Sequence, residues 1–344
     1  MEKMKVAMYY NNSDIRIEEM SIPEIDENEI LVKVQVCGIC GSDVMEWYRI
    51  KKAPKVLGHE MAGDIVKIGK NVKKFKVGDR IFVSHHVPCN SCSFCNDDFH
   101  TLCDTLHSTN FYPGGFAEYL KVPKINIDSG VFILPKEISY EEGAFIEPLA
   151  CVVRGLRIAE MKPGINVLVL GSGVAGLLNI KLAKAMGAKK IFATDIDDYR
   201  LNYAKKMGAD IVIKADKNIP KEIKKHNSDK LADLVILCAG VSSAARQAMD
   251  SVEKAGTILL FAPTKPGVDV PIPMFDIWNK QVKIVSTYAG APVDIKESIE
   301  LIKSKKVEVK DMITHRFPLN QAAEGFKLAA KASGSIKIII EPQK

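Results

Sequence analysis

The chain has 344 residues, which is longer than one hydrophobic core usually supports, so two domains are expected. Its composition, 47% hydrophobic and 26% charged, is typical of a globular protein and excludes a disordered or fibrous chain. The net charge is +6, but the lysines are scattered and not interleaved with aromatic residues, so we interpret them as solvated surface and expect no nucleic-acid partner.

Neither the N-terminus nor the interior predicts a membrane association. Residues 1–10 lack the apolar stretch of a secretory signal. The longest apolar run, 165–180, is interrupted by polar residues and glycines and is not a membrane helix. We therefore expect a cytoplasmic protein, in which the eight cysteines serve as metal ligands or buried thiols rather than disulfides.

The first 150 residues predict a β-rich antiparallel domain. Short runs of β-forming residues are separated by turn signals such as Gly69-Lys70-Asn71. The strands expected here are Lys5–Tyr9, Ile30–Val36, Ala62–Ile68, Arg80–Val83 and Phe116–Val122.

Three residues near the start of this domain form a candidate catalytic zinc site. Cys40 lies in a Cys-Gly-Ile-Cys-Gly-Ser-Asp run, and His59 and Glu60 follow in a Gly-His-Glu run. A thiolate, an imidazole and a carboxylate are a plausible three-ligand set that leaves one zinc position open for substrate. The alternative is a redox pair of Cys37 and Cys40, but such pairs usually accompany a βαβ pattern that is absent here. Cys37 ends an apolar strand and is expected to be buried.

Four further cysteines follow in a C-x2-C-x2-C-x7-C pattern within a polar segment, 84–113, for which we expect no regular structure. Four thiolates at this spacing can enclose one tetrahedral ion, which leaves no position for substrate and so predicts a structural zinc. An iron–sulfur cluster uses the same ligands, and disulfides are the remaining alternative. The cysteines concerned are Cys89, Cys92, Cys95 and Cys103.

From Pro163 onward the pattern changes to alternating strands and helices, which predicts a doubly wound parallel sheet. A last helix near 294–304 and a strand at 336–340 are expected to return to the first domain. The alternating elements are a strand at 165–170, a helix at 174–186, a strand at 191–194, a helix at 198–207, a strand at 211–213, a helix at 218–227, a strand at 233–238, a helix at 243–254, and strands at 257–261 and 282–285.

A G-x-G-x-x-G run at the first of these turns predicts a dinucleotide site. Gly171 permits the tight turn, Gly173 lets the backbone approach a pyrophosphate, and Gly176 allows close helix–strand packing. The next strand ends at Asp195, which would accept hydrogen bonds from ribose hydroxyls and repel a 2′-phosphate, so NAD is predicted over NADP. Arg200 could approach the adenine and weaken that discrimination.

Taken together, these motifs resemble the zinc-dependent medium-chain dehydrogenase/reductase family over nearly the whole chain. Within that family, residues 141–149 and 314–317 are most similar to sorbitol-type polyol dehydrogenases. The matching runs are Cys40-Gly41-Ser42-Asp43, Gly58-His59-Glu60, the four-cysteine segment, Gly114-Gly115-Phe116-Ala117-Glu118-Tyr119, Glu147-Pro148-Leu149, the glycine-rich turn and Thr314-His315-Arg316-Phe317.

The resemblance implies a GroES-like catalytic domain, residues 1–150 and 290–344, and a Rossmann domain, residues 151–289. It also implies NAD as cofactor, two zinc ions per subunit and a homo-oligomer, either a dimer or a homotetramer. Within the site it implies that Glu147 is a fourth acid, binding zinc directly or through water, and that Ser42 passes on the substrate proton. The residues implied to flank the nicotinamide are Val174, Phe261, Ala262 and Pro263.

The function expected from the resemblance is hydride transfer between a secondary alcohol, a polyol or sugar alcohol, and NAD. The sequence departs from the sorbitol type in having Met45 and Glu46 where a His-Tyr pair is expected, and an Arg-Tyr pair near 289–290 is absent. Threonine, a sugar phosphate or a simple secondary alcohol are therefore alternative substrates. A non-enzymatic dinucleotide-binding relative is disfavoured because such relatives are expected to lose zinc ligands, and this chain has them all.

Overall fold

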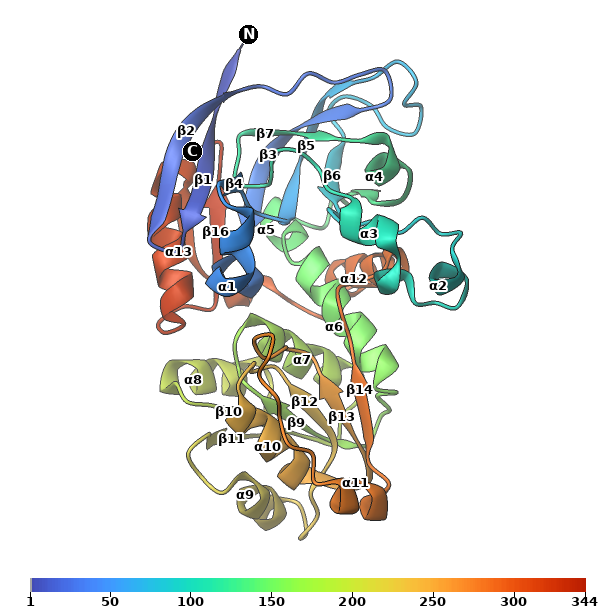
Figure 1. Ribbon diagram of the computed structural model, residues 1–344, viewed down its shortest axis with the longest axis vertical. Coiled ribbons are helices and arrows are strands. Elements are labelled where there is room, and N and C mark those ends of the chain that lie inside the picture. The colour runs from blue at the N-terminus through green and yellow to red at the C-terminus, as the bar shows by residue number, and fades with distance from the viewer. Residues whose placement is uncertain (1) are drawn as a thin grey trace. The chain divides into compact units, whose positions relative to one another are not determined.

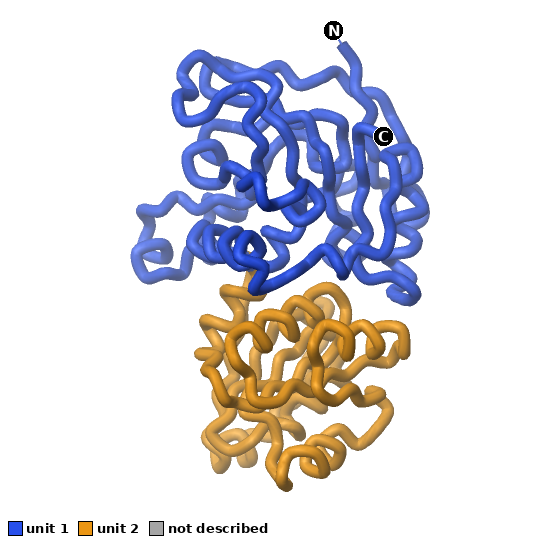
Figure 2. Tube along the Cα trace, turned by 180° about the vertical axis from the view of Figure 1, so that it is seen from behind, with its two compact units in different colours: residues 1–150, 290–344 blue, residues 151–289 orange. Residues whose placement is uncertain are grey.

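The structure is a computed structural model that describes residues 2–344 (Figure 1). The chain divides into two compact units, which Figure 2 distinguishes by colour. The first is built from the residues up to Ala150 together with Gly290–Lys344, and the second from Cys151–Ala289. Within residues 2–344, no helix is long and apolar enough to cross a membrane.

The first unit contains two sheets. A seven-stranded sheet has the order β15-β16-β3-β5-β6-β8, with β7 on β3, and a smaller sheet has the order β2-β1-β4. All pairings are antiparallel except β15 with β16. The strands are β1 (Lys3–Asn11), β2 (Asp14–Ser21), β3 (Ile30–Gly38), β4 (Lys55–Val56), β5 (Glu60–Ile68), β6 (Arg80–Val83), β7 (Tyr119–Val122), β8 (Val131–Ile133), β15 (Ile313–Pro318) and β16 (Lys337–Glu341).

Short helical segments connect these strands, and three of them correct the expectation of an irregular 84–113 segment. There α2 (Ser93–Asn96), η3 (His100–Leu102) and α3 (Asp104–Ser108) wind around the cysteines, whose spacing sets the turns. The other helices of this unit are η1 (Gly41–Val44), α1 (Glu46–Arg49), η2 (Ile50–Lys52), α4 (Lys124–Ser129), α5 (Tyr140–Gly143), α12 (Pro292–Lys303), η4 (Lys310–Met312), η5 (Leu319–Gln321) and α13 (Ala322–Lys331).

The second unit is built on a six-stranded parallel sheet in the order β11-β10-β9-β12-β13-β14. The central strand β9 is buried along its whole length, as expected for a strand covered on both faces. Its strands are β9 (Asn166–Leu170), β10 (Lys190–Asp195), β11 (Ile211–Lys214), β12 (Ala232–Leu237), β13 (Val252–Leu260) and β14 (Lys283–Ser286), and its helices are α7 (Val174–Ala185), α8 (Asp198–Met207), α9 (Ile219–His226), α10 (Ser242–Ser251) and α11 (Met274–Lys280).

The expected fold class, a GroES-like β-rich domain with a Rossmann-type parallel sheet, is confirmed, whereas some boundaries differ. Helix α10 ends at Ser251 rather than 254, because residues 252–260 form the longer strand β13. Helix α6 (Ile146–Ile158), which connects the two units along the chain, was not predicted. The last strand, β16, pairs with β3 of the first unit, as expected.

Candidate metal centres and dinucleotide site

The first candidate metal centre brings together Cys40, His59 and Glu60. One possible ligand atom from each of the three residues lies within 4.8 Å of the other two. Cys40 caps η1, and Glu60 opens β5. Gly58, with φ +95°, allows the chain to turn just before His59. A thiolate, an imidazole and a carboxylate at this separation form a donor set that suits zinc.

A buried carboxylate orients the imidazole of this set. Asp43 is fully buried, and its Oδ1 lies 3.4 Å from His59 Nδ1. Its Oδ2 accepts a hydrogen bond from the Cys40 backbone at 3.1 Å, and Arg49 donates to Oδ1 at 3.3 Å. Burial opposes ionisation of Asp43, but His59 and Arg49 hold its pKa below the ordinary value. The contact fixes the imidazole so that Nε2 can bind a metal.

A buried lysine contacts the carboxylate of the set. The Lys337 and Glu60 side chains are 0% and 1% exposed and form an ion pair. Lys337 Nζ also donates to the Ile39 carbonyl at 3.3 Å. Burial disfavours the charged amine, but Glu60, Cys40 and Glu147 raise the pKa of Lys337, so the ammonium is retained. A Cβ on Gly38 would lie 2.4 Å from Glu60 Oε2 and 2.6 Å from Lys337 Cε, so only glycine leaves room for the pair.

Ser42, the expected proton-transfer residue, lies beside Cys40. Its hydroxyl donates to Cys40 Sγ at 3.4 Å and accepts from Arg49 at 2.9 Å. Glu147, the expected fourth acid, is not among the residues whose ligand atoms cluster, although its charge acts on Lys337. Of the four residues expected around the catalytic ion, the structure therefore brings together Cys40, His59 and Glu60 but does not place Glu147 with them.

The second candidate metal centre contains Cys89, Cys92, Cys95 and Cys103, whose sulfur atoms lie within 4.8 Å of one another. The Cys92 and Cys95 sulfurs are 3.5 Å apart, far longer than the ~2.05 Å of a disulfide. Backbone N–H groups of Cys92 and Cys89 donate to the sulfurs of Cys89 and Cys103 at 3.3 and 3.4 Å. Hydrogen bonds from Ser91 lower the pKa of Cys89 to about 5. In contrast, burial and the hydrogen bond to Cys92 raise the pKa of Cys95 to about 12. The cluster in the absence of an ion therefore favours a thiolate at Cys89 but not at Cys95, and four sulfurs at this separation fit a closed tetrahedral site.

In the second unit, the glycine-rich turn connects β9 to α7 and leaves space for a ligand. Gly171 adopts φ +96°, and a Cβ on Gly176 would lie 1.9 Å from the Gly171 carbonyl oxygen. Both positions therefore require glycine. At Gly173 a Cβ would meet only the Arg200 guanidinium, at 3.9 Å. The α7 N-terminus at this open position can receive a pyrophosphate.

Asp195 and Arg200 lie around the same turn. Asp195 is buried, and its two oxygens accept hydrogen bonds from the backbones of Ser172 at 2.7 Å and Asp197 at 3.0 Å. Each oxygen keeps a lone pair for a ribose hydroxyl. Arg200 Nε is buried and has no hydrogen-bond partner within residues 2–344. An orphaned buried donor beside the uncrowded position of Gly173 fits a bound dinucleotide.

The predicted nicotinamide-flanking segment follows β13. Phe261 and Ala262 both donate their backbone N–H groups to the Leu237 carbonyl, at 3.1 and 2.9 Å. A Cβ on Gly240 would lie 2.3 Å from the Pro263 carbonyl oxygen. Because β9, β12 and β13 are parallel neighbours, the turns after their carboxyl ends converge at one edge of the sheet, which is where open α/β sheets bind ligands. Val174, at the start of α7, lies at this edge too.

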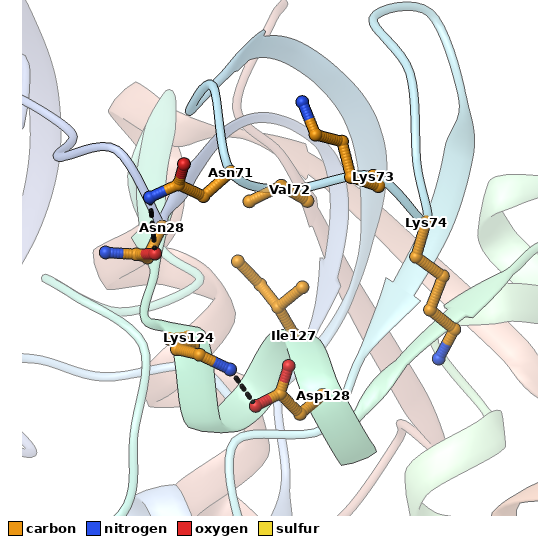
Figure 3. A pocket seen from close by; sticks show the side chains of 8 residues that line it. All are labelled: Asn28, Asn71, Val72, Lys73, Lys74, Lys124, Ile127 and Asp128. Atoms are coloured by element: carbon orange, nitrogen blue, oxygen red, sulfur yellow. Dashed lines mark hydrogen bonds and ion pairs between the residues drawn. The ribbon is translucent and has the colours of Figure 1, made fainter.

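One surface hollow lies outside these sites. Asn28 and Asn71 are hydrogen-bonded to each other across it, and Lys124 pairs with Asp128 (Figure 3). The hollow is also lined by Lys73 and Lys74, and none of the candidate site residues lines it. We therefore assign it no role.

Comparison with known proteins identifies the family. Residues 26–129 match the alcohol dehydrogenase GroES-like domain, and residues 175–304 match the zinc-binding dehydrogenase domain. The chain is 32% identical to sorbitol dehydrogenase of Bacillus subtilis (strain 168), over 100% of this chain and 98% of that protein. The chain therefore belongs to the zinc-dependent medium-chain alcohol dehydrogenase family, among its polyol dehydrogenase-like members, and is an oxidoreductase.

Solved structures agree with this assignment. A protein from Sinorhizobium meliloti 1021, solved with NADP bound, is 28% identical and superposes with a TM-score of 0.89, covering 99% of this chain and 100% of that one. An alcohol dehydrogenase from Escherichia coli CFT073, complexed with NADH, is 26% identical with a TM-score of 0.89, over 99% and 100%. Galactitol-1-phosphate dehydrogenase from Escherichia coli is 26% identical with a TM-score of 0.84, over 98% and 100%.

Three residues that support the first metal centre received no role from the sequence. Asp43 lies inside the Cys40 motif, and its position three residues after a ligand was a usable signal. Lys337 is an ionisable residue directly before three consecutive isoleucines of β16, which is a sign of a buried partner. Arg49 lies in a lysine-rich run that resembles ordinary surface, so nothing in the sequence singled it out.

Proposed function

We propose that the protein oxidises a secondary alcohol of the polyol or sugar-alcohol class with NAD, using one catalytic zinc, and carries a second, structural zinc. The convergence of Cys40, His59 and Glu60 within 4.8 Å carries this proposal. Its relatives support the substrate class, since sorbitol dehydrogenase is similar over the full length of the chain. Threonine, a sugar phosphate and a simple secondary alcohol are the alternatives.

Cys40, His59 and Glu60 would hold the catalytic ion, and bound zinc would supply Lewis acidity that lowers the pKa of an alcohol oxygen toward neutrality. Asp43 keeps His59 in the ligating tautomer, and Lys337 gives the Glu60 carboxylate a buried positive partner. The two anionic ligands, Cys40 and Glu60, would offset the positive charge of the bound ion. The buried position of Glu60 and Asp43 limits the access of water to it.

Ser42 is the chain's candidate for receiving the substrate proton. In the structure its hydroxyl donates to Cys40 Sγ, so it must turn away from the sulfur to pass its own proton outward as it takes the substrate proton. Arg49 donates to the same oxygen at 2.9 Å and would stabilise the partial negative charge that develops there as the hydroxyl proton leaves. Glu147 is proposed as the fourth residue at the ion, bound to it directly or through water.

The glycine-rich turn with Asp195 and Arg200 is proposed to bind NAD, whose nicotinamide would supply the hydride acceptor. Asp195 favours NAD because its carboxylate would repel a 2′-phosphate. Arg200 would weaken this preference, since its unpartnered Nε–H could donate a hydrogen bond to a 2′-phosphate. Similar proteins have been solved with NADP and with NADH bound, so the proposed preference for NAD over NADP rests on Asp195.

We also propose a homo-oligomer, a dimer or a tetramer, in a reducing, cytoplasmic compartment. Helix α11 exposes Met274, Phe275 and Trp278 at 70%, 70% and 73%, beside the edge strand β14. Large exposed apolar side chains next to an unpaired strand edge favour association. None of the eight cysteines, all of which lie within residues 2–344, forms a disulfide, and two thiolate metal sites require a reducing environment.

The experiment that tests the proposed function is a spectrophotometric screen of polyols, threonine and simple secondary alcohols with NAD and with NADP. We expect reduced nicotinamide to form with a polyol and NAD, and to stop when a chelator removes zinc. No turnover on any alcohol by a protein loaded with zinc would refute the proposal. Light scattering gives the oligomeric state in the same preparation.

A further inference from the structure

A β-bulge lies at Thr314, beside the strand that carries Lys337. In the pairing of β15 with β16, Ile313 lies opposite Lys337. The next paired residue of β15 is His315, so Thr314 is an extra residue that the ladder skips. Bulges interrupt a ladder and are over-represented next to functional sites. Thr314 also opens the Thr-His-Arg-Phe run, one of the two runs most similar to polyol dehydrogenases.

The Thr314 hydroxyl bridges the two strands where the ladder is interrupted. It accepts a hydrogen bond from the Ile336 backbone N–H at 3.1 Å and donates one to the Lys337 carbonyl at 3.3 Å. Nδ1 of His315 lies 3.0 Å from the same oxygen. Residues 332–336, which lead into Lys337, form neither helix nor strand. The Thr314 side chain therefore fixes the backbone at the point where β16 begins.

From this backbone the Lys337 side chain reaches a tightly enclosed position. It is 0% exposed, contacts the Glu60 carboxylate and donates to the Ile39 carbonyl at 3.3 Å. Its Nζ also lies 5.5 Å from the centroid of the buried Phe145 ring, which belongs to the other polyol-type run. A Cβ on Gly38 would come within 2.9 Å of the same nitrogen. A shift of the Lys337 backbone would therefore take the ammonium away from Glu60.

Lys337 and a bound zinc ion would share one carboxylate. Without the ion, the ammonium is the buried counter-charge of Glu60. With the ion bound, two positive charges would be held by the same carboxylate and would repel each other. An ammonium fixed in place therefore stabilises the metal-free protein more than the zinc-loaded protein, and it weakens zinc binding by the same free energy.

We propose that Thr314 is a positioning residue for the first metal centre. Its hydroxyl holds the backbone of Lys337, which keeps the ammonium on Glu60 and thereby limits how tightly that centre binds zinc. The inference rests on the proposed catalytic zinc and adds to it a residue outside the ligand set. Because Thr314 acts through Lys337, a variant without the hydroxyl should behave as a weaker form of Lys337→Met.

The test measures the zinc dissociation constants of the protein by competition with a chelator. Cys40→Ser, which should keep only the four-cysteine site, shows which constant belongs to the first centre. In Thr314→Val, which keeps the branched shape without the hydroxyl, that constant should fall about tenfold, equivalent to ~1.4 kcal/mol. Thr314→Ser keeps the hydroxyl and should bind zinc as the intact protein does. Ser298→Ala, which removes a buried hydroxyl that donates to Asp294 within α12, should change neither constant.

Thermal unfolding separates this role from a purely structural one. The Tm of Thr314→Val should fall more without zinc than with zinc, and Thr314→Val combined with Lys337→Met should bind zinc as Lys337→Met alone does. If Thr314→Val does not fold, Thr314→Ala, which leaves room for a water, should show the same shift. An unchanged or raised zinc constant in the folded variant, or an equal fall in Tm with and without zinc, would overturn the inference. Binding of only one zinc by the intact chain would instead refute the proposed function, and the inference with it.

Discussion

The ammonium of Lys337 contacts the carboxylate of Glu60 in the interior of the first unit, with neither side chain exposed beyond 1%. Lys337 comes from β16 and Glu60 from β5, and the intervening strand β3 contributes Gly38, which leaves the space for the contact. A carboxylate proposed to bind zinc is therefore shared with a fixed cation. The pair offsets part of the negative charge that Cys40 and Glu60 bring into the protein interior.

Removing this cation should destabilise the metal-free protein more than the zinc-loaded protein. In Lys337→Met the Glu60 carboxylate loses its counter-ion, and breaking a buried pair costs about 3–5 kcal/mol. Bound zinc provides an alternative counter-charge, so the loss should be smaller in its presence. Thermal unfolding with and without zinc measures both effects. Lys3→Met, which removes a pair exposed on both sides, is the control and should change little.

The double variant Lys337→Met with Glu60→Gln isolates the charge effect. It removes both charges, so the metal-free protein should recover part of the stability lost in Lys337→Met alone. An equal loss of stability with and without zinc in Lys337→Met would show that the lysine acts only through packing.

Ser42→Ala should retain zinc and NAD but lose turnover. General acid–base groups contribute about 100- to 10,000-fold, so a decrease of kcat in that range is expected. Ser42→Thr, which keeps the hydroxyl, is the matched control. Zinc content and NAD binding are measured alongside kcat. Undiminished kcat in Ser42→Ala would remove this hydroxyl from the mechanism.

Asp195→Asn should shift the cofactor preference toward NADP. The amide keeps an acceptor for the backbone of the turn but loses the charge that repels a 2′-phosphate, so the NAD/NADP ratio of kcat/KM should fall about tenfold or more. Asp198→Asn removes a nearby exposed acid that pairs with Lys214 and should leave the ratio unchanged. The assignment of Asp195 to the ribose is wrong if both variants behave alike.

Cys103→Ser should remove the structural zinc and unfold the segment around it. That segment has only Leu106 and the cysteines in its own apolar cluster, so the metal is expected to supply its folding free energy, on the order of 10 kcal/mol. Limited proteolysis should then cut between residues 84 and 113, and the zinc content should fall by one. Cys151→Ala, outside both cysteine sets, should keep the full zinc content.

The extent to which the sequence predicted these features differs between the two units. The parallel sheet followed from continuous apolar runs and a glycine-rich turn, because strand burial and phosphate approach impose strict residue types. The short helices of the cysteine segment and α6 were missed, since the former depend on tertiary constraints rather than on hydrophobic periodicity.

In the candidate site, too, the residues with strict chemical requirements were predicted and those that depend on tertiary contacts were not. Cys40, His59 and Glu60 were recognised because soft and charged ligands at close spacing are rare by chance. The contact of Lys337 with Glu60 depends on two strands distant in the sequence meeting in space, so the sequence indicated only scattered surface lysines. Charges without partners become visible only once burial and neighbours are known.

Zinc content measured together with alcohol oxidation in Cys40→Ser tests the central claim most directly. The intact protein should contain two zinc ions per chain and reduce NAD with an alcohol. Cys40→Ser should contain one zinc, fold as before, and show no turnover. Retention of both zinc ions, or of turnover, by that variant would contradict a catalytic zinc held by Cys40, His59 and Glu60.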